Sequence, residues 1–147
     1  DPINSSADGT VNNAIKYADY ALGKYFEAAK KESYYRNTVF LIIGDHSTRL
    51  SGEDLVPIHK FHVPALIIGP GVQPGTFDRA ASQIDMPSTL LELMGFSATV
   101  PLFGRALAHL PENFKGRAII QYGEDNLYLE EEQAVLHRPK KQAAQFV

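Results

Sequence analysis

Apolar residues gather in two short unbroken runs, and each run is followed by residues that end a regular element. The first run ends at Gly44, and the second covers residues 63–68 before the turn-forming Gly69-Pro70-Gly71. Continuous apolar stretches of this length, rich in β-branched residues, predict strands that are buried on both faces. We therefore expect strands over residues 37–44 and 63–68.

Two other stretches repeat their apolar residues at the spacing of an α-helix, which predicts helices over residues 10–31 and 86–94. Asp85 stands where the second helix needs an N-cap, and Gly95 stands where its C-terminal end needs a residue with a left-handed backbone. The inner face of this helix is expected to consist of Leu90, Leu91 and Met94.

The pattern changes after Arg117, where shorter segments are separated by turn-forming residues. These segments cover residues 118–122, 126–129 and 134–138. The acidic run Glu130-Glu131-Glu132 lies between the last two and is expected to be a solvated turn rather than a binding tract. Residues 118–147 are therefore predicted to form a small antiparallel subregion.

Strands alternating with a loop and a helix predict an α/β fold with a central, mostly parallel sheet flanked by helices. Two strong central strands are too few for a doubly wound sheet that is stable by itself. Residues 1–147 are therefore interpreted as the C-terminal part of a single larger domain whose N-terminal half is absent.

An Asp-His pair, Asp45-His46, follows the first predicted strand, where ligands bind in open α/β sheets. A carboxylate oxygen and a neutral imidazole nitrogen are both ligands for divalent metal ions. Gly44 is expected to let the backbone turn sharply just before the pair. The alternative is that Asp45 caps a turn and His46 is an ordinary polar neighbour. Two residues are also fewer than a metal site needs, so other ligands must come from elsewhere.

Four further polar residues are candidates for substrate contacts. Ser47 and Arg49 follow the pair and are candidates to face a bound anion, although the surface-loop alternative is favoured for Arg49. His59 and His62 precede the second strand and are expected to return toward the same end of the sheet. His62 is favoured because it adjoins the strand, and the alternative for both is an exposed loop histidine.

Composition narrows the classes of function. The chain is 44% hydrophobic, which allows a core, and its net charge is −3 with acidic and basic residues interspersed. Because there is no basic stripe, binding to nucleic acid has no support. The absence of cysteine excludes disulfides and thiolate metal sites. No glycine-rich loop links a strand to a helix, which disfavours a doubly wound nucleotide-binding domain.

Four segments, in this order, resemble the C-terminal part of the sulfatase-like branch of the alkaline phosphatase superfamily. Within that branch they are most similar to lipoteichoic-acid-synthase-like phosphoglycerol transferases. The segments are Gly44-Asp45-His46, residues 62–71 (HVPALIIGPG), residues 82–95 (SQIDMPSTLLELMG) and Phe103-Gly104-Arg105-Ala106-Leu107. The last is close to a Gly-Arg-Asp-Leu segment of the family, and we expect it to shape a loop.

The resemblance implies a metal-dependent hydrolase or transferase of phosphoric or sulfuric esters. In that family an Asp-His pair, an acidic residue and a threonine nucleophile hold a divalent metal ion. The pair corresponds to Asp45 and His46. The other two ligands belong to the N-terminal half, so no catalytic nucleophile is expected among these residues. The implied cofactor is Mn²⁺, with Mg²⁺, Zn²⁺ and Ca²⁺ as alternatives.

The resemblance also implies partners and a location. One partner is a phosphate- or sulfate-ester substrate, and a lipid- or glycan-linked ester is one form that it could take. The other partner is the N-terminal half of the same domain. The implied location is the extracytoplasmic or periplasmic face of a membrane, as part of a membrane-anchored protein. A different class of function is still open, namely a non-catalytic binding or structural α/β module in which Asp45 and His46 only shape a loop.

Overall fold

The computed structural model describes residues 10–47, 54–139 and 142–146. The chain divides after Thr38 into two compact units, and each is described by itself. The helices within these ranges are all too short or too polar to cross a membrane.

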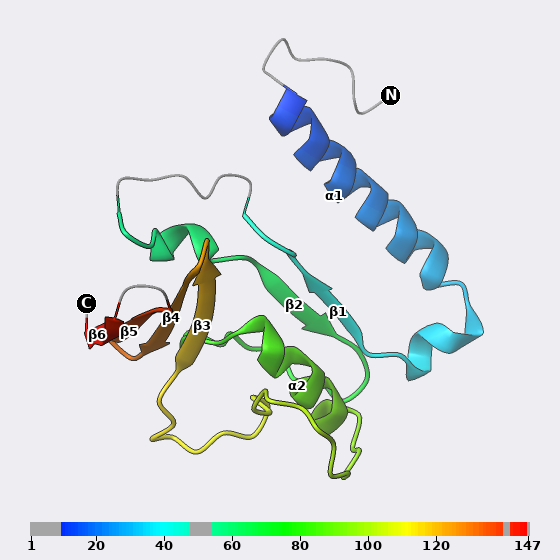
Figure 1. The fold of residues 1–147 in the computed structure, drawn as a ribbon. Coiled ribbons are helices and arrows are strands. Elements are labelled where there is room, and N and C mark those ends of the chain that lie inside the picture. Colours follow the sequence, from blue (N-terminus) through cyan, green and yellow to red (C-terminus); the bar gives the residue numbers. More distant parts are fainter. Residues whose placement is uncertain (1–9, 48–53, 140–141, 147) are drawn as a thin grey trace. The chain divides into compact units, whose positions relative to one another are not determined.

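Helix α1 (Thr10–Ala29) and the 3₁₀ helix η1 (Ser33–Asn37) are the described elements of the first unit (Figure 1). The predicted helix is confirmed, although it ends two residues before position 31. The strand predicted to begin at residue 37 begins later, because the Thr38 N–H and hydroxyl bond back to the carbonyls of Tyr35 and Tyr34 and extend the 3₁₀ turn.

Strands β1 (Phe40–Ile43) and β2 (Ala65–Ile68) open the second unit and pair with each other in antiparallel register, Phe40 opposite Ile68 and Ile43 opposite Ala65. The expected parallel pairing is therefore wrong for these strands. Parallel neighbours need a crossover connection, which is usually an α-helix. In its described part, the connection between β1 and β2 contains only the short 3₁₀ helix η2 (Ile58–Phe61).

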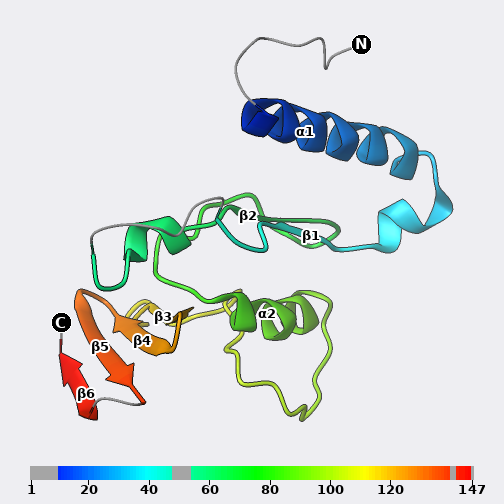
Figure 2. The ribbon, with the colours of Figure 1, turned by 45° about the horizontal axis from the view of Figure 1, so that its top comes forward.

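The prediction that both strands are buried on both faces is also wrong for the described chain. Every residue of β1 is half-buried, and in β2 Leu66 is 55% exposed. The reason is that the described sheet has two strands, with helix α2 (Met86–Leu93) to one side of it (Figures 1 and 2).

Helix α2 follows the 3₁₀ turn η3 (Gln83–Asp85) and ends at Leu93, one residue before the predicted position 94, with Gly95 in the expected left-handed conformation. Gly95 has a φ of 74°, and the next amide, Phe96 N, donates to Leu91 O at 2.9 Å, which closes the C-terminal turn. Met94 does not belong to the inner face, since the helix has ended before it and its side chain is 46% exposed.

The small antiparallel subregion predicted for residues 118–147 is confirmed as a four-stranded sheet in the order β3-β4-β5-β6. Its strands are β3 (Arg117–Tyr122), β4 (Asp125–Glu130), β5 (Gln133–Arg138) and β6 (Gln142–Phe146). The core of the unit lies on this sheet and consists of Ile120, Leu127, Ala134 and Leu136, with Val56, Phe61 and Leu129 packed against them. Glu131 and Glu132 form the exposed turn between β4 and β5, as expected.

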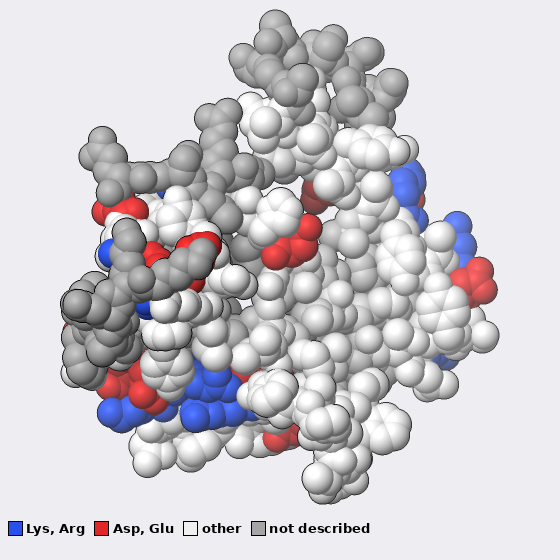
Figure 3. Space-filling model, in the orientation of Figure 1, with Lys and Arg blue, Asp and Glu red and all other residues white. Residues whose placement is uncertain are grey.

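Charged side chains of both signs adjoin one another on the face drawn in Figure 3, and much of that face is uncharged. A field of a single sign would steer a charged ligand from a distance. Since charges of both signs are mixed on this face, local geometry and not a long-range field distinguishes the candidate site.

Candidate metal centre

Asp45 and His46 lie immediately after β1, at its carboxyl end, as the sequence predicted. The antiparallel pairing continues one step past Ile43, because Gly44 N donates to Pro64 O at 3.0 Å. The φ angle of Gly44 is not positive, so a sharp turn is not the reason that a glycine occupies this position. A Cβ at this position would lie 3.3 Å from Val63 Cβ, and the glycine therefore allows the two strand ends to approach closely.

The two side chains converge in the exposed space beyond the strand. The Asp45 side chain is 86% exposed and the His46 side chain 72%. Asp45 Oδ1 accepts a hydrogen bond from His46 N at 2.9 Å, while Asp45 Oδ2 lies 3.3 Å from His46 Nε2. His46 Nδ1 lies 2.9 Å from Ser47 O. Because a carbonyl oxygen only accepts, Nδ1 carries the proton in that hydrogen bond.

This arrangement leaves Nε2 of a neutral His46 without a proton and 3.3 Å from a carboxylate oxygen. Two such atoms 3.3 Å apart repel unless a second proton sits on Nε2 or a cation lies near both of them. Protein nitrogen and oxygen ligands bind divalent metals such as zinc at about 2.0–2.2 Å, so one ion can reach both atoms. The donor atoms and their spacing therefore fit a divalent metal. Within the ranges that the structure describes, no third His, Asp or Glu joins them to complete a metal-binding group.

The other predicted site residues lie at different distances from the pair along the chain. Ser47 is half-buried and contributes its carbonyl to the orientation of the His46 ring. His62 is exposed and lies two residues before Pro64, which places it at the same end of the sheet as the pair. His59 is exposed within η2. Arg49 lies outside the described residues.

Sequence reasoning assigned no role to Gln83, yet its side chain contacts the loop that carries the pair. Gln83 Nε2 donates to Gly44 O at 2.7 Å and to Asp45 O at 3.0 Å. The only signal in the sequence is its place within the family-like segment 82–95, where it directly follows Ser82.

Asp85 occupies the predicted N-cap position of α2, but its side chain does not cap the helix. Asp85 is 1% exposed, and its carboxylate makes no hydrogen bond to the first turn of α2. Instead Oδ2 accepts from Ser82 N at 2.9 Å, and Oδ1 accepts from Arg105 N at 2.8 Å and Arg117 Nη2 at 3.1 Å. A buried carboxylate is stabilised by several donors and an opposite charge more than by a helix end. Asp85 thus joins η3 to the loop at Arg105 and to strand β3.

The segment around Gly104 shapes a loop, as expected. A Cβ on Gly104 would lie 1.7 Å from Ile84 O, so only glycine allows this loop to cross the backbone of η3. Ser88 Oγ donates to Gly104 O at 3.0 Å and fixes the crossing from the α2 side.

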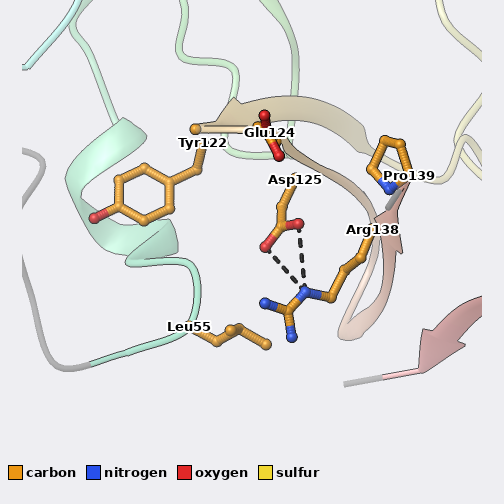
Figure 4. A pocket seen from close by; sticks show the side chains of 7 residues that line it. Leu55, Tyr122, Glu124, Asp125, Arg138 and Pro139 are labelled. Atoms are coloured by element: carbon orange, nitrogen blue, oxygen red, sulfur yellow. Dashed lines mark hydrogen bonds and ion pairs between the residues drawn. The ribbon is translucent and has the colours of Figure 1, made fainter. Parts of the chain in front are cut away.

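A separate open pocket of about 460 Å³ lies at the tip of the β3–β4 hairpin. It is lined by Leu55, Tyr122, Gly123, Glu124, Asp125, Arg138 and Pro139. Figure 4 shows the Asp125 and Arg138 side chains directed toward each other, with Arg138 Nε 3.2 Å from Asp125 Oδ2. None of the residues predicted to bind metal or substrate lines this pocket, so it is distinct from the candidate metal centre.

Several known proteins are similar to this chain. A sulfatase of Formosa agariphila is 27% identical over 122 residues, and lipoteichoic acid synthase of Staphylococcus aureus is 32% identical over 105 residues. The lipoteichoic acid synthase-like protein YvgJ of Bacillus subtilis is 28% identical over 114 residues. The matches cover 76%, 62% and 65% of this chain, respectively, but only 24%, 16% and 18% of the relatives.

A crystal structure of a protein in the alkaline phosphatase superfamily from Vibrio parahaemolyticus matches the fold with a TM-score of 0.86 and 44% sequence identity. The match covers 97% of this chain and 35% of that protein. The family model described as Sulfatase matches residues 2–96, which is more than half of the chain and includes Asp45 and His46. These matches confirm the resemblance found in the sequence: the chain belongs to the sulfatase family of the alkaline phosphatase superfamily.

Proposed function

We propose that this chain is the C-terminal part of a metal-dependent hydrolase or transferase of phosphoric or sulfuric esters, and that Asp45 and His46 bind its divalent metal ion. The observation that carries the proposal is the convergence of Asp45 Oδ2 and His46 Nε2, 3.3 Å apart at the end of β1. Membership of the sulfatase family supports the same reaction class.

Each residue of the pair has a distinct task. The Asp45 carboxylate offsets part of the charge of the ion, and His46 offers Nε2 because the Ser47 carbonyl holds the proton on Nδ1. A bound divalent ion supplies positive charge that stabilises the negative charge developing on a transferring phosphoryl or sulfuryl group. We propose Mn²⁺ as the ion, with Mg²⁺, Zn²⁺ and Ca²⁺ as the alternatives.

The remaining ligands, the nucleophile and much of the substrate site are proposed to come from an N-terminal half of the same domain. The chain spans about a quarter or less of the lengths of its curated relatives, which supports this division. The proposed substrate is a phosphate or sulfate ester, and lipid-linked and glycan-linked esters are among the candidates. The similarity to lipoteichoic acid synthases supports phosphoglycerol transfer on the extracytoplasmic or periplasmic face of a membrane. His62, His59, Ser47 and Arg49 are proposed substrate contacts.

The proposal is tested by metal content and activity in the full-length protein. Asp45→Asn keeps the shape of the side chain but removes its charge, and His46→Ala removes the ligand nitrogen. Mutation of a residue that only supports a metal ligand typically lowers metal affinity or activity by about 10–100-fold. Loss of a ligand itself is therefore expected to lower them at least as much. Elemental analysis gives the bound metal, and turnover of chromogenic phosphate and sulfate esters gives the activity and the preferred ester.

His109→Ala is the matched control. His109 is an exposed histidine that pairs with Glu92 at 3.2 Å near α2, and it lies in none of the candidate contacts. The His109→Ala variant is expected to keep its bound metal and its activity. Its melting temperature is expected to equal those of Asp45→Asn and His46→Ala. Unchanged metal content in Asp45→Asn and His46→Ala would reject the metal site and favour the non-catalytic module. Equal losses in all three variants would show general destabilisation.

A further inference from the structure

In the described part of the chain, the Gln83 side chain ties the loop that carries Asp45 and His46 to an element that is distant in sequence. The two carbonyls bonded by Gln83 Nε2, Gly44 O at 2.7 Å and Asp45 O at 3.0 Å, belong to the peptide groups on either side of the Asp45 Cα. The orientations of these two peptide planes define φ and ψ of Asp45. One amide group with two hydrogens therefore sets the backbone conformation from which the Asp45 side chain projects.

Gln83 is itself well anchored, because Ser82 just before η3 and Asp85 at its end are buried and hydrogen-bonded. Ser82 N donates to Asp85 Oδ2 at 2.9 Å, and Ser82 Oγ accepts from Ile119 N of β3 at 2.7 Å. Ser82 is 8% exposed and Asp85 1%. The backbone of Gln83 thus lies between two fixed points, while its exposed side chain reaches to the end of β1.

The pair has little other support for its position. The hydrogen bonds described for the two side chains are local: one joins His46 N to Asp45 Oδ1, and another joins the His46 ring to Ser47 O. Local contacts of this kind move together with the loop. The contact from Gln83 is different, since it ties the loop to a separate element, 39 positions away from Gly44.

We propose that Gln83 is a positioning residue for the metal-binding pair. Its amide holds the Gly44 and Asp45 carbonyls so that the Asp45 and His46 ligand atoms stay close enough to share one ion. The inference rests on the proposed metal site and adds a residue to which neither the sequence pattern nor the family membership assigned a role. Both hydrogen bonds described for the Gln83 amide go to backbone carbonyls of the loop, so Gln83 acts through the pair.

The test uses Gln83→Met in the full-length protein, because methionine has nearly the same length and no charge but cannot donate. Gln121→Met is the matched control, since Gln121 is an exposed glutamine of β3 with no part in the site. The first measurement is the Kd for Mn²⁺ of the metal-free protein by calorimetry. The second is hydrogen exchange of peptides covering residues 42–47 in the same metal-free protein.

Gln83→Met is expected to raise the Kd by about 10–100-fold, as is typical when a partner that orients a metal ligand is removed. Exchange in residues 42–47 is expected to become faster, while the melting temperature of the metal-free protein stays at the value of the Gln121→Met control. An unchanged Kd or unchanged exchange would overturn the inference. A higher Kd with a matching loss of melting temperature would also overturn it, because Gln83 would then support the fold in general.

Failure of the proposed function gives a different result. In that case the unaltered protein and Asp45→Asn would bind Mn²⁺ equally well, or neither would bind it. The comparison of these two proteins therefore decides the metal site before Gln83→Met is interpreted.

Discussion

Replacing Asp85 with alanine is expected to be among the most damaging single changes in the described part of the chain. The carboxylate accepts hydrogen bonds from Ser82 N, Arg105 N and Arg117 Nη2, and it is the ion-pair partner of Arg117. The side chains of Asp85 and Arg117 are only 2% and 7% exposed. Asp85→Ala therefore leaves a buried guanidinium charge, a buried backbone donor and a partly buried backbone donor without their acceptor.

The magnitude follows from burial. Removal of one partner of a buried ion pair costs about 3–5 kcal/mol, because the remaining charge is not solvated. Arg117 Nε already has no hydrogen-bond partner among the described residues. By contrast, the Lys115–Glu131 pair has side chains that are 61% and 53% exposed, and such pairs contribute about 0–1 kcal/mol. Lys115→Gln is therefore the matched control.

Hydrogen exchange of the full-length protein measures the effect locally, in peptides covering residues 80–90 and 103–108. Because about 1.4 kcal/mol corresponds to a factor of ten, Asp85→Ala is expected to lower protection there by two to three orders of magnitude. The double variant Asp85→Ala/Arg117→Met is expected to be no less stable than Asp85→Ala, since it leaves no charge buried. A loss as small as that of Lys115→Gln would refute the reasoning.

Two further predictions concern the loop over η3 and the reaction. Gly104→Ala is expected to cost about 1–3 kcal/mol, as over-packing does, because its Cβ would lie 1.7 Å from Ile84 O. Gly75→Ala, with nothing within 4 Å of its Cβ, is expected to leave the melting temperature unchanged. The 147-residue chain produced alone is expected to show no turnover of chromogenic phosphate or sulfate esters, because its nucleophile and third ligand are proposed to lie elsewhere. Turnover that Asp45→Ala abolishes would contradict this.

The positions of most elements could be predicted from the sequence, because apolar spacing and turn residues act locally. The direction of pairing between β1 and β2 could not. A continuous apolar run has the same composition in a parallel and an antiparallel sheet, and the choice depends on the connection. Strand β6 was missed for a different reason: its sequence, Gln-Ala-Ala-Gln-Phe, has no β-branched residue, and it forms by pairing with β5.

At the candidate site, the pair itself was predictable and its support was not. Asp45 and His46 stand out because they follow a strand directly. Gln83 reaches them from 38 and 39 positions away, and such a contact leaves no local pattern. Asp85 was misinterpreted because an aspartate before a helix has the same sequence signature whether it caps the helix or accepts from buried donors elsewhere.

The two-stranded ribbon of β1 and β2 has a consequence for how the protein is assembled and handled. Each strand has one neighbouring strand among the described residues, and Leu66 adds an exposed apolar side chain. Apolar edges of this kind template intermolecular pairing, and an isolated hairpin is only marginally stable in water. Self-association is therefore the main hazard of producing this chain by itself. If the proposed N-terminal half supplies strands to this sheet, its co-expression in trans is expected to reduce self-association.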